Sequence, residues 1–292
     1  MIEAVLSQKK REVDQRLSHL LTEDIPEHRR LYEAMNYSLL AGGKRIRPIL
    51  FLLTLDALGM ESGRYMDAAC AIECVHTYSL IHDDLPQMDN DEYRRGRLTN
   101  HMVYGAGMAT MAGDGLLTAA FEILSAMDVI PPGLRCDAMA LLARAAGSSG
   151  MVGGQAQDIE AENRALSLAE LQCMDKYKTG CLLSAPVDMA ALLAGAEETV
   201  REALHQYGLR LGQLFQITDD LLDAMGSLEE MGKLPGQDRV MKKATYLTLM
   251  GMDKAKACAA AEGKAAKESI ACLGAAGNTL RDLADYIEKR TK

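Results

Sequence analysis

The sequence has few of the features that a β-rich protein needs. Only seven prolines occur in 292 residues, and valine and isoleucine never alternate with polar residues over the length of a strand. Strands normally appear as such alternating runs, bounded by turn residues. Alanine, leucine, methionine and glutamate dominate instead, and these residues favour helices. The sequence therefore predicts an all-α protein.

Paired cysteines are also absent. The seven cysteines include no CxxC pair, and no histidines lie near them at the spacing of zinc ligands. This pattern excludes a disulfide framework and a structural zinc site, so we expect buried, reduced thiols. The cysteines lie at positions 70, 74, 136, 173, 181, 258 and 272.

An excess of positive charge and a long apolar run are missing as well. The formal net charge is -9, whereas nucleic acids and anionic membranes attract basic surfaces. No apolar run approaches the roughly 20 residues that a membrane-spanning helix requires. Charged residues occur within the first ten residues, unlike the pattern of a secretory signal. We therefore expect a cytoplasmic protein with no membrane span and no nucleic-acid partner.

Glycine and proline divide the chain into helical stretches. Apolar residues recur at helical spacing between the breaks, as at Leu116, Ala119, Ala120, Ile123 and Leu124. No linker-like segment and no repeat of fixed period interrupts this pattern, so residues 1–292 are predicted to form a single domain. Ser167 and Glu170 have the spacing of a helix-capping box. The predicted breaks are 42–43, 59–63, 86–96, 131–133, 147–154 and 226–236.

Two aspartate clusters follow apolar helical segments. In the second, residues 218–223 read TDDLLD, so Asp219 and Asp223 project from one helix face with Asp220 beside them. Adjacent like charges repel unless a cation neutralises them, and hard carboxylate oxygens suit Mg²⁺. A solvated acidic helix end is the structural alternative for either cluster taken alone.

The first cluster, residues 82–91, reads HDDLPQMDND. Pro86 should end the helix just after Asp83 and Asp84, which would let Asp89 curl back toward them. Asn90 and Asp91 are equally typical of a turn, and we leave them out of the metal site.

Basic residues accompany both clusters. Mg²⁺ is commonly shared between carboxylates and phosphate oxygens, so the pair of clusters predicts a phosphate-ester substrate. Arginine and lysine can bind such oxygens, although each is also typical of a solvated loop. They lie in GGKRIRP (42–48), at Arg94 and Arg95, in KYKTG (176–180), and at Lys233 and Lys243. Lys267, Arg290 and Lys292 near the C-terminus are interpreted as solvated charges.

Taken in order, these motifs resemble the trans-isoprenyl diphosphate synthase family, most closely the bacterial farnesyl diphosphate synthases and their plant geranylgeranyl relatives. AGDG (112–115), GGQAQD (153–158) and FQITDDLLD (215–223) extend the match along the chain. The resemblance implies a bundle of about ten to thirteen helices around a deep central cavity. It also implies a homodimer, with three Mg²⁺ between the acidic motifs and the allylic diphosphate.

The resemblance further implies roles for individual residues. Ionisation of an allylic diphosphate would give a cation, which the double bond of isopentenyl diphosphate attacks before a proton is lost. Thr179 and Gln216 would lie near that cation, and Lys178 and Lys233 would help the diphosphate to leave. The implied magnesium ligands are Asp83, Asp84, Asp89, Asp219 and Asp223. Arg94, Lys178 and Lys233 would bind the allylic diphosphate, and Lys44, Arg47, His76 and Arg95 the isopentenyl diphosphate, with Lys243 a further candidate.

Some positions depart from the family pattern or have another interpretation. Lys243 follows Met241-Lys242 where relatives have a Gly-Lys-Ser/Thr pattern, so its role stays open. The segment at Gly236 also differs from the commoner Gly-Lys-Asp, which affects the loop that carries Lys233. By pattern alone, His76 is equally consistent with a helix-surface histidine.

Product length should depend on the residues that precede Asp83. Tyr78 and Ser79 lie about one helical turn before it, and a bulky residue there would act as a floor of the cavity. Tyr78, together with the two extra residues between Asp84 and Asp89, resembles the bacterial farnesyl pattern, which implies a fifteen-carbon product. A twenty-carbon product remains the alternative, with Tyr78 in the core and the depth set near Met108 or Ala112. A non-catalytic modifying subunit or a terpene cyclase fits less well, because both acidic clusters and the basic residues are complete.

Overall fold

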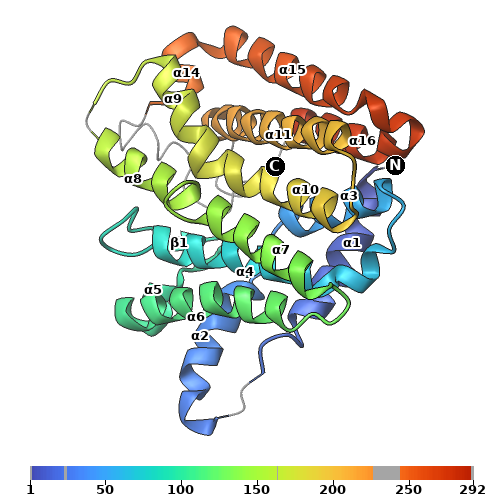
Figure 1. Ribbon diagram of the computed structural model, residues 1–292. Coiled ribbons are helices and arrows are strands. Elements are labelled where there is room, and N and C mark those ends of the chain that lie inside the picture. Colours follow the sequence, from blue (N-terminus) through green and yellow to red (C-terminus); the bar gives the residue numbers. More distant parts are fainter. Residues whose placement is uncertain (1, 23–24, 163, 226–243, 291–292) are drawn as a thin grey trace. The chain divides into compact units, whose positions relative to one another are not determined.

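The computed structural model describes residues 2–22, 25–162, 164–225 and 244–290. Beyond the first two residues, the chain divides into two compact units: Glu3–Leu52 with Glu61–Met139, and Leu53–Met60 with Ala140–Lys292. Both units are helical (Figure 1), so the all-α prediction is confirmed. The single-domain assignment stays a prediction. Among the described residues, every helix is too short or too polar to span a bilayer.

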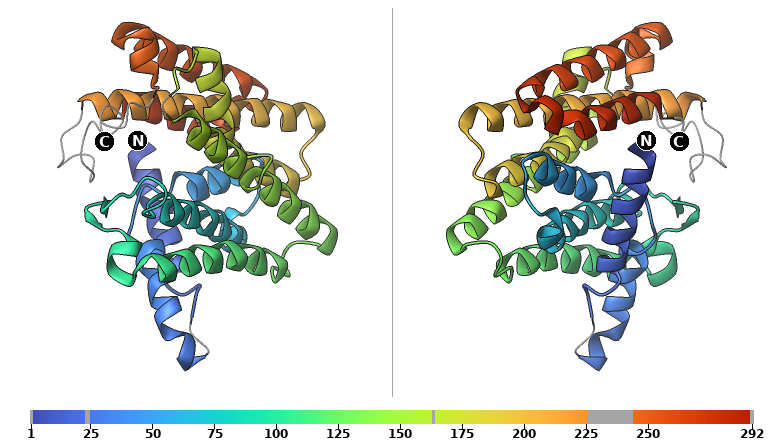
Figure 2. Two further views of the ribbon diagram at one scale, coloured as in Figure 1. Left: turned by 90° about the vertical axis from the view of Figure 1, so that its left-hand side faces the viewer. Right: turned by 90° about the vertical axis from the view of Figure 1, so that its right-hand side faces the viewer.

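The first unit is built around α4 and α6, which lie side by side (Figure 2). Buried alanines such as Ala69 and Ala112 line these helices and leave little side-chain bulk between the two axes. The unit contains α1 (Ile2–Leu17), η1 (Pro26–His28), α2 (Arg29–Leu39), η2 (Ser62–Tyr65), α4 (Met66–Asp83), β1 (Tyr93–Arg94), β2 (Arg97–Leu98), α5 (Asn100–Tyr104) and α6 (Ala106–Ser125). Two helices, α3 (Ile46–Ala57) and α7 (Pro132–Ala146), cross the division between the units.

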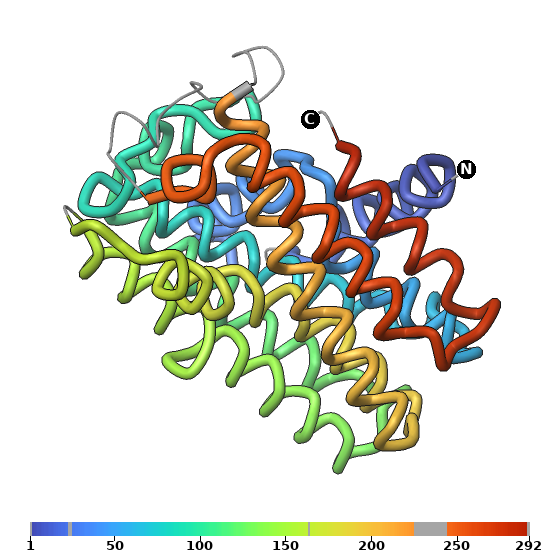
Figure 3. Tube along the Cα trace, turned by 90° about the horizontal axis from the view of Figure 1, so that it is seen from above, coloured from blue at the N-terminus to red at the C-terminus, as the bar shows by residue number. Residues whose placement is uncertain are grey.

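The second unit is organised by α11, which packs against α10 and α15 (Figure 3). The amphipathic α16 also packs on α11, and the buried hydroxyl of Tyr207 donates a 2.6 Å hydrogen bond to the Leu280 carbonyl. The elements are α8 (Met151–Ala161), α9 (Leu168–Asp175), η3 (Lys176–Gly180), α10 (Cys181–Leu193), α11 (Glu198–Met225), α14 (Tyr246–Met250), α15 (Met252–Ser269), η4 (Ala271–Gly277) and α16 (Asn278–Lys289).

Several local predictions can be compared with the structure. The capping box is confirmed, because Ser167 and Glu170 bond each other's backbone N–H at the start of α9. The predicted break at 147–154 extends too far, since α8 already begins at Met151. The prediction that all cysteines are buried is wrong for three of them, Cys136, Cys173 and Cys272, which are exposed; Cys181 and Cys258 are half-buried, and Cys70 and Cys74 are buried.

Candidate active site

The first acidic cluster lies where α4 ends. The helix stops at Asp83, and the Asp89 N–H then donates a 2.9 Å hydrogen bond to the Asp83 carbonyl. Asn90, with φ +54°, helps to close this turn, and asparagine tolerates such a conformation. The chain therefore curls back as predicted, so the backbone of Asp89 meets that of Asp83. Asp84 is buried, whereas Asp83 and Asp89 are half-buried.

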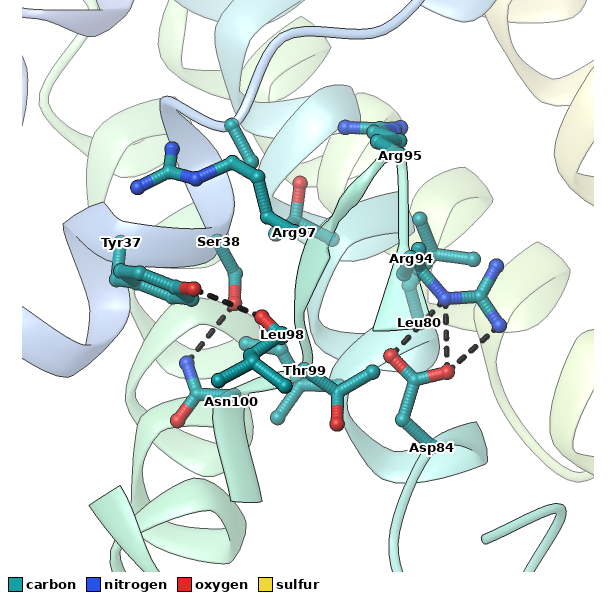
Figure 4. Close-up of a pocket in the computed structure, with 13 residues that line it drawn as sticks. Tyr37, Ser38, Leu80, Asp84, Arg94, Arg95, Arg97, Leu98, Thr99 and Asn100 are labelled. Carbon is teal, nitrogen blue, oxygen red and sulfur yellow. Dashed lines mark hydrogen bonds and ion pairs between the residues drawn. The ribbon is translucent and has the colours of Figure 1, made fainter. Parts of the chain in front are cut away.

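Arg94 contacts this cluster from a short hairpin. Its Nε and Nη2 both lie 2.7 Å from Asp84 Oδ1 (Figure 4). Burial raises the pKa of Asp84, Arg94 lowers it, and the carboxylates of Asp91 and Asp89 raise it again. The cluster therefore concentrates negative charge that one guanidinium offsets only in part.

The hairpin itself consists of β1 and β2, paired antiparallel with Arg94 opposite Arg97. Arg95 and Gly96 form its two-residue turn with φ of +54° and +73°, the signs that a type I′ turn needs. Strands of two residues carry no alternating pattern, so they could not be predicted from hydrophobic periodicity. Because of this turn, the side chains of the neighbouring residues Arg94 and Arg95 contact different partners.

Contacts with α2 hold the hairpin in place. The Tyr37 hydroxyl donates a 2.8 Å hydrogen bond to the Leu98 carbonyl, and the Arg97 guanidinium lies 4.6 Å from the Tyr37 ring centroid. Asn100, just after β2, donates to Ser38 Oγ at 2.8 Å. These residues line a pocket beside Arg94 and Arg95 (Figure 4), so α2 fixes the position from which both arginines extend.

A group of positively charged side chains lies near His76 in the same unit. Arg47 Nη1 is 3.3 Å from His76 Nε2, and Arg95 donates a hydrogen bond to the Gly42 carbonyl. Burial, followed by the charges of Arg47 and Arg95, holds the pKa of His76 well below its usual value. The predicted residues Arg47, His76 and Arg95 are thus brought together with an excess of positive charge, which favours an anion.

The two other basic residues of the GGKRIRP motif differ in their surroundings. Lys44 is exposed. Arg45, whose side chain is 1% exposed, donates to Glu73 Oε1 at 2.6 Å and to Asp14 Oδ1 at 2.8 Å. Arg45 therefore links α1 and α4 in the core, while Lys44 and Arg47 remain able to meet a ligand.

Tyr78 is buried on α4, and its ring packs edge-on against His82 with centroids 5.7 Å apart. Burial, and then the charge of Asp83, raises the pKa of Tyr78 to about 12. Ser79 is half-buried, and its hydroxyl donates to the His76 carbonyl at 2.9 Å. Tyr78 is thus a neutral, bulky side chain one turn before the first cluster.

The second acidic cluster occupies the last turns of α11. Asp219 is 46% exposed, whereas Asp220 and Asp223 are buried. Arg290, which we expected to be a solvated charge, is instead buried and lies 2.5 Å from Asp219 Oδ1. Asp220 accepts from the Tyr246 N–H at 2.8 Å, so this aspartate ties the start of α14 to α11.

The predicted residues Lys178 and Thr179 lie on a π-helical turn, η3, between α9 and α10. Such turns often occur at functional sites. Lys178 Nζ lies 2.5 Å from Asp158 Oδ2, and Thr179 Oγ1 donates to Gln216 Oε1 at 3.2 Å. A Cβ at Gly154 would lie 2.1 Å from the Lys178 nitrogen, so glycine is needed where α8 meets η3.

Gln216 links the π turn to the second acidic cluster, because its Nε2 donates to Asp220 Oδ1 at 3.2 Å. Nearby, burial and then the charge of Asp220 raise the pKa of Asp175 to about 7. Asp175, Asp158 and Arg290 were not selected from the sequence. Their contacts join residues far apart in the chain, so spacing could not reveal them.

Aspartates of both clusters provide the hard oxygen donors that Mg²⁺ prefers. Within the described ranges, no three acidic, histidine or cysteine side chains already converge as a cation site. Arginines contact Asp84 and Asp219 instead. The predicted ligands of the diphosphate at Lys233 and Lys243 lie outside the described residues.

Comparisons with known proteins match nearly the whole chain. The family model described as Polyprenyl synthetase matches residues 28–276. A farnesyl diphosphate synthase of Geobacillus stearothermophilus is 44% identical over 99% of this chain and 98% of its own. A chloroplastic geranylgeranyl pyrophosphate synthase of Capsicum annuum is also 44% identical, over 89% of this chain and 71% of its own.

Solved structures agree with these sequence matches. An FPP/GFPP synthase of Zymomonas mobilis superposes with a TM-score of 0.88 at 36% identity, covering 98% of both chains. A geranyltransferase of Helicobacter pylori, complexed with magnesium and isoprenyl diphosphate, gives 0.84 at 33% identity and covers 97% of this chain and 96% of its own. The family resemblance inferred from the motifs is therefore confirmed.

Proposed function

The chain belongs to the polyprenyl synthetase family, and we propose that it joins isopentenyl diphosphate head to tail to dimethylallyl or geranyl diphosphate, giving farnesyl diphosphate. The observation that carries this proposal is the pairing of two aspartate clusters with arginine and lysine side chains, in a chain 44% identical to a farnesyl diphosphate synthase. A diphosphate can be bound and activated by basic side chains together with a metal ion that carboxylates hold.

Magnesium is the cofactor that the donor set fits. Carboxylate oxygens at two helix ends are hard ligands, and the turn between Asp83 and Asp89 returns the chain to the helix end. Bound magnesium would neutralise the charge that develops on the departing diphosphate. The residues that would hold it are Asp83, Asp84, Asp89, Asp219 and Asp223, and the resemblance implies three ions per chain.

Isopentenyl diphosphate binds at the positive group around His76. Arg47 and Arg95 present planar guanidinium forks there, and exposed Lys44 adds a point charge. No cluster of carboxylates is needed at this position, because the cationic side chains neutralise the diphosphate themselves. His76, whose pKa is low, acts as a neutral hydrogen-bonding group rather than as an added charge.

The allylic diphosphate binds Arg94 and Lys178, together with Lys233. Lys178 and Arg94 each contact a carboxylate now, Asp158 and Asp84, and these contacts orient their charged ends. As the C–O bond of the allylic diphosphate breaks, both cations stabilise the leaving oxygen.

The oxygens of Thr179 and Gln216 then stabilise the allylic cation. Gln216 Oε1 accepts a hydrogen bond from Thr179, while its Nε2 donates to Asp220, so its carbonyl dipole is held in one orientation. The isopentenyl double bond forms the new C–C bond, and a proton leaves the adjacent carbon for the released diphosphate. No strong base from the protein is required.

Tyr78 limits the product to fifteen carbons. It is the bulky buried side chain five residues before Asp83, with the smaller Ser79 beside it. Geranylgeranyl diphosphate is the second candidate product, because a geranylgeranyl pyrophosphate synthase matches at the same identity as the farnesyl enzyme.

The protein acts in the cytoplasm as a homodimer. Apolar side chains exposed near the junction of α5 and α6, at Met102, Val103 and Met111, support an interface with a second copy. Sedimentation of the purified protein tests this assignment, and a monomer at micromolar concentration would contradict it.

Product analysis tests the function. Purified protein is incubated with Mg²⁺, labelled isopentenyl diphosphate and dimethylallyl, geranyl or farnesyl diphosphate, and the dephosphorylated products are sized by chromatography. We expect a fifteen-carbon alcohol from the dimethylallyl and geranyl primers. A twenty-carbon product would keep the chemistry and reject Tyr78 as the floor. No incorporation with any primer would indicate a non-catalytic subunit.

A further inference from the structure

Arg290 lies just beyond the last helix and reaches the second acidic cluster. Its side chain is 3% exposed, although the residue follows the last residue of α16, Lys289. Its partner Asp219 is 46% exposed. A buried guanidinium that holds a half-exposed carboxylate is unusual, because charged side chains normally extend into water.

Several contacts besides the one with Asp219 hold this guanidinium. Its Cζ lies 4.0 Å from the Phe215 ring centroid, and Nη2 donates to the Phe215 carbonyl and to Thr218 Oγ1, each at 2.8 Å. A further bond at 3.2 Å joins Nε to Thr218 Oγ1. The fork of Arg290 is therefore anchored on α11, one turn before the acidic residues.

The helix that carries Arg290 is anchored as well. Leu280, Leu283 and Ile287 are fully buried, and the Leu280 carbonyl accepts the hydrogen bond from Tyr207. Backbone dihedral angles become extended at Arg290, so the chain leaves the helix at the residue whose side chain meets α11. Packing of α16 thus determines where this guanidinium lies.

We propose that Arg290 is a positioning residue that holds Asp219 Oδ1 and thereby orients the other carboxylate oxygen for a divalent cation. The inference rests on the proposed function, in which Asp219 is a magnesium ligand. A carboxylate offers about four lone-pair positions, so one oxygen can accept from arginine while the other binds metal. Because the carboxylate is already held in one orientation, it loses less conformational entropy when the metal binds.

Competition between Arg290 and the cation for Asp219 is the opposite interpretation. In that case the guanidinium would have to leave when metal arrives. It also contacts the Phe215 ring and carbonyl and Thr218, and these contacts would keep it in place when metal binds. The geometry therefore favours a fixed support over a displaceable counter-ion.

Manganese binding to the full-length protein tests the inference without relying on turnover. Free Mn²⁺ is measured by electron paramagnetic resonance in the presence of saturating inorganic diphosphate. We expect Arg290→Ala to weaken Mn²⁺ binding about tenfold, the size usual for loss of a group that supports a metal ligand. Lys289→Ala, at the exposed neighbouring position, is the matched control and should bind Mn²⁺ like the wild type.

Two further variants separate support of Asp219 from a general structural role. Arg290→Lys should also weaken Mn²⁺ binding, because lysine lacks the planar guanidinium that lies over the Phe215 ring and the Nε–H that donates to Thr218. In an Asp219→Asn background, Arg290→Ala should add less than about twofold, since the two residues act through one ligand. Thermal unfolding verifies that each variant is folded. If Arg290→Ala is not folded, Arg290→Lys is measured in its place.

The outcomes distinguish the inference from the function on which it rests. Unchanged or tighter Mn²⁺ binding by folded Arg290→Ala, with normal binding by the wild type, would overturn the inference alone. An equal loss in the wild-type and Asp219→Asn backgrounds would also overturn it. Failure of the wild type to bind Mn²⁺ with diphosphate would overturn the proposed function, and this inference with it.

Discussion

Replacing Gly43 by alanine should damage the proposed isopentenyl diphosphate site through a clash with Arg95. A Cβ at Gly43 would lie 2.6 Å from Arg95 Cζ and 2.7 and 2.9 Å from its two Nη atoms, so the guanidinium must move. Loss of one hydrogen bond between charged groups costs about 1.5–3 kcal/mol. At 1.4 kcal/mol per factor of ten, KM for isopentenyl diphosphate should rise at least about tenfold.

Gly42→Ala is the matched control for this experiment. Both glycines have positive φ, +84° at Gly42 and +117° at Gly43, so alanine is strained at either position. No atom lies within 4 Å of a Cβ at Gly42. Steady-state kinetics with each substrate varied in turn should therefore give a raised KM for isopentenyl diphosphate only in Gly43→Ala. Equal KM values in the two variants would refute the reasoning.

The remaining predictions concern the acidic residues and product length. Asp83→Ala and Asp219→Ala should each abolish turnover while circular dichroism shows an intact fold; retained turnover would remove them as metal ligands. Tyr78→Ala should lengthen the product from fifteen to twenty carbons in the sizing assay, and an unchanged product would place the floor elsewhere. Asp175→Asn should become more stable than the wild type as pH rises from 4 to 7. The folded-state pKa of Asp175, about 7, exceeds its ordinary value of 3.8, so ionisation costs the native wild type up to about 4 kcal/mol. Urea unfolding at both pH values measures this difference, and a constant difference would contradict it.

Helix class and the acidic turn could be predicted because their causes are local. Alanine and leucine at helical spacing favour helices, and proline four positions after His82 ends α4 at Asp83. The same local reasoning identified the capping box of Ser167 and Glu170. Family motifs then supplied candidate roles for residues such as His76. By sequence pattern alone, His76 was equally consistent with an exposed histidine on a helix surface.

Contacts between distant segments could not be predicted in this way. Arg290 and Asp219 are 71 residues apart, and an arginine side chain is ordinarily solvated. Likewise, Arg45 belongs to a candidate ligand-binding motif, but its side chain forms a buried ion pair with Glu73 of α4. Their partners become evident only when the helices are packed.

Anomalous diffraction from a crystal grown with Mn²⁺ and an unreactive thio analogue of geranyl diphosphate tests whether both acidic clusters bind metal together with the diphosphate. We expect manganese peaks beside carboxylate oxygens of Asp83 or Asp89 and of Asp219, with diphosphate oxygens completing their coordination. Diphosphate bound without manganese at either acidic cluster would contradict it.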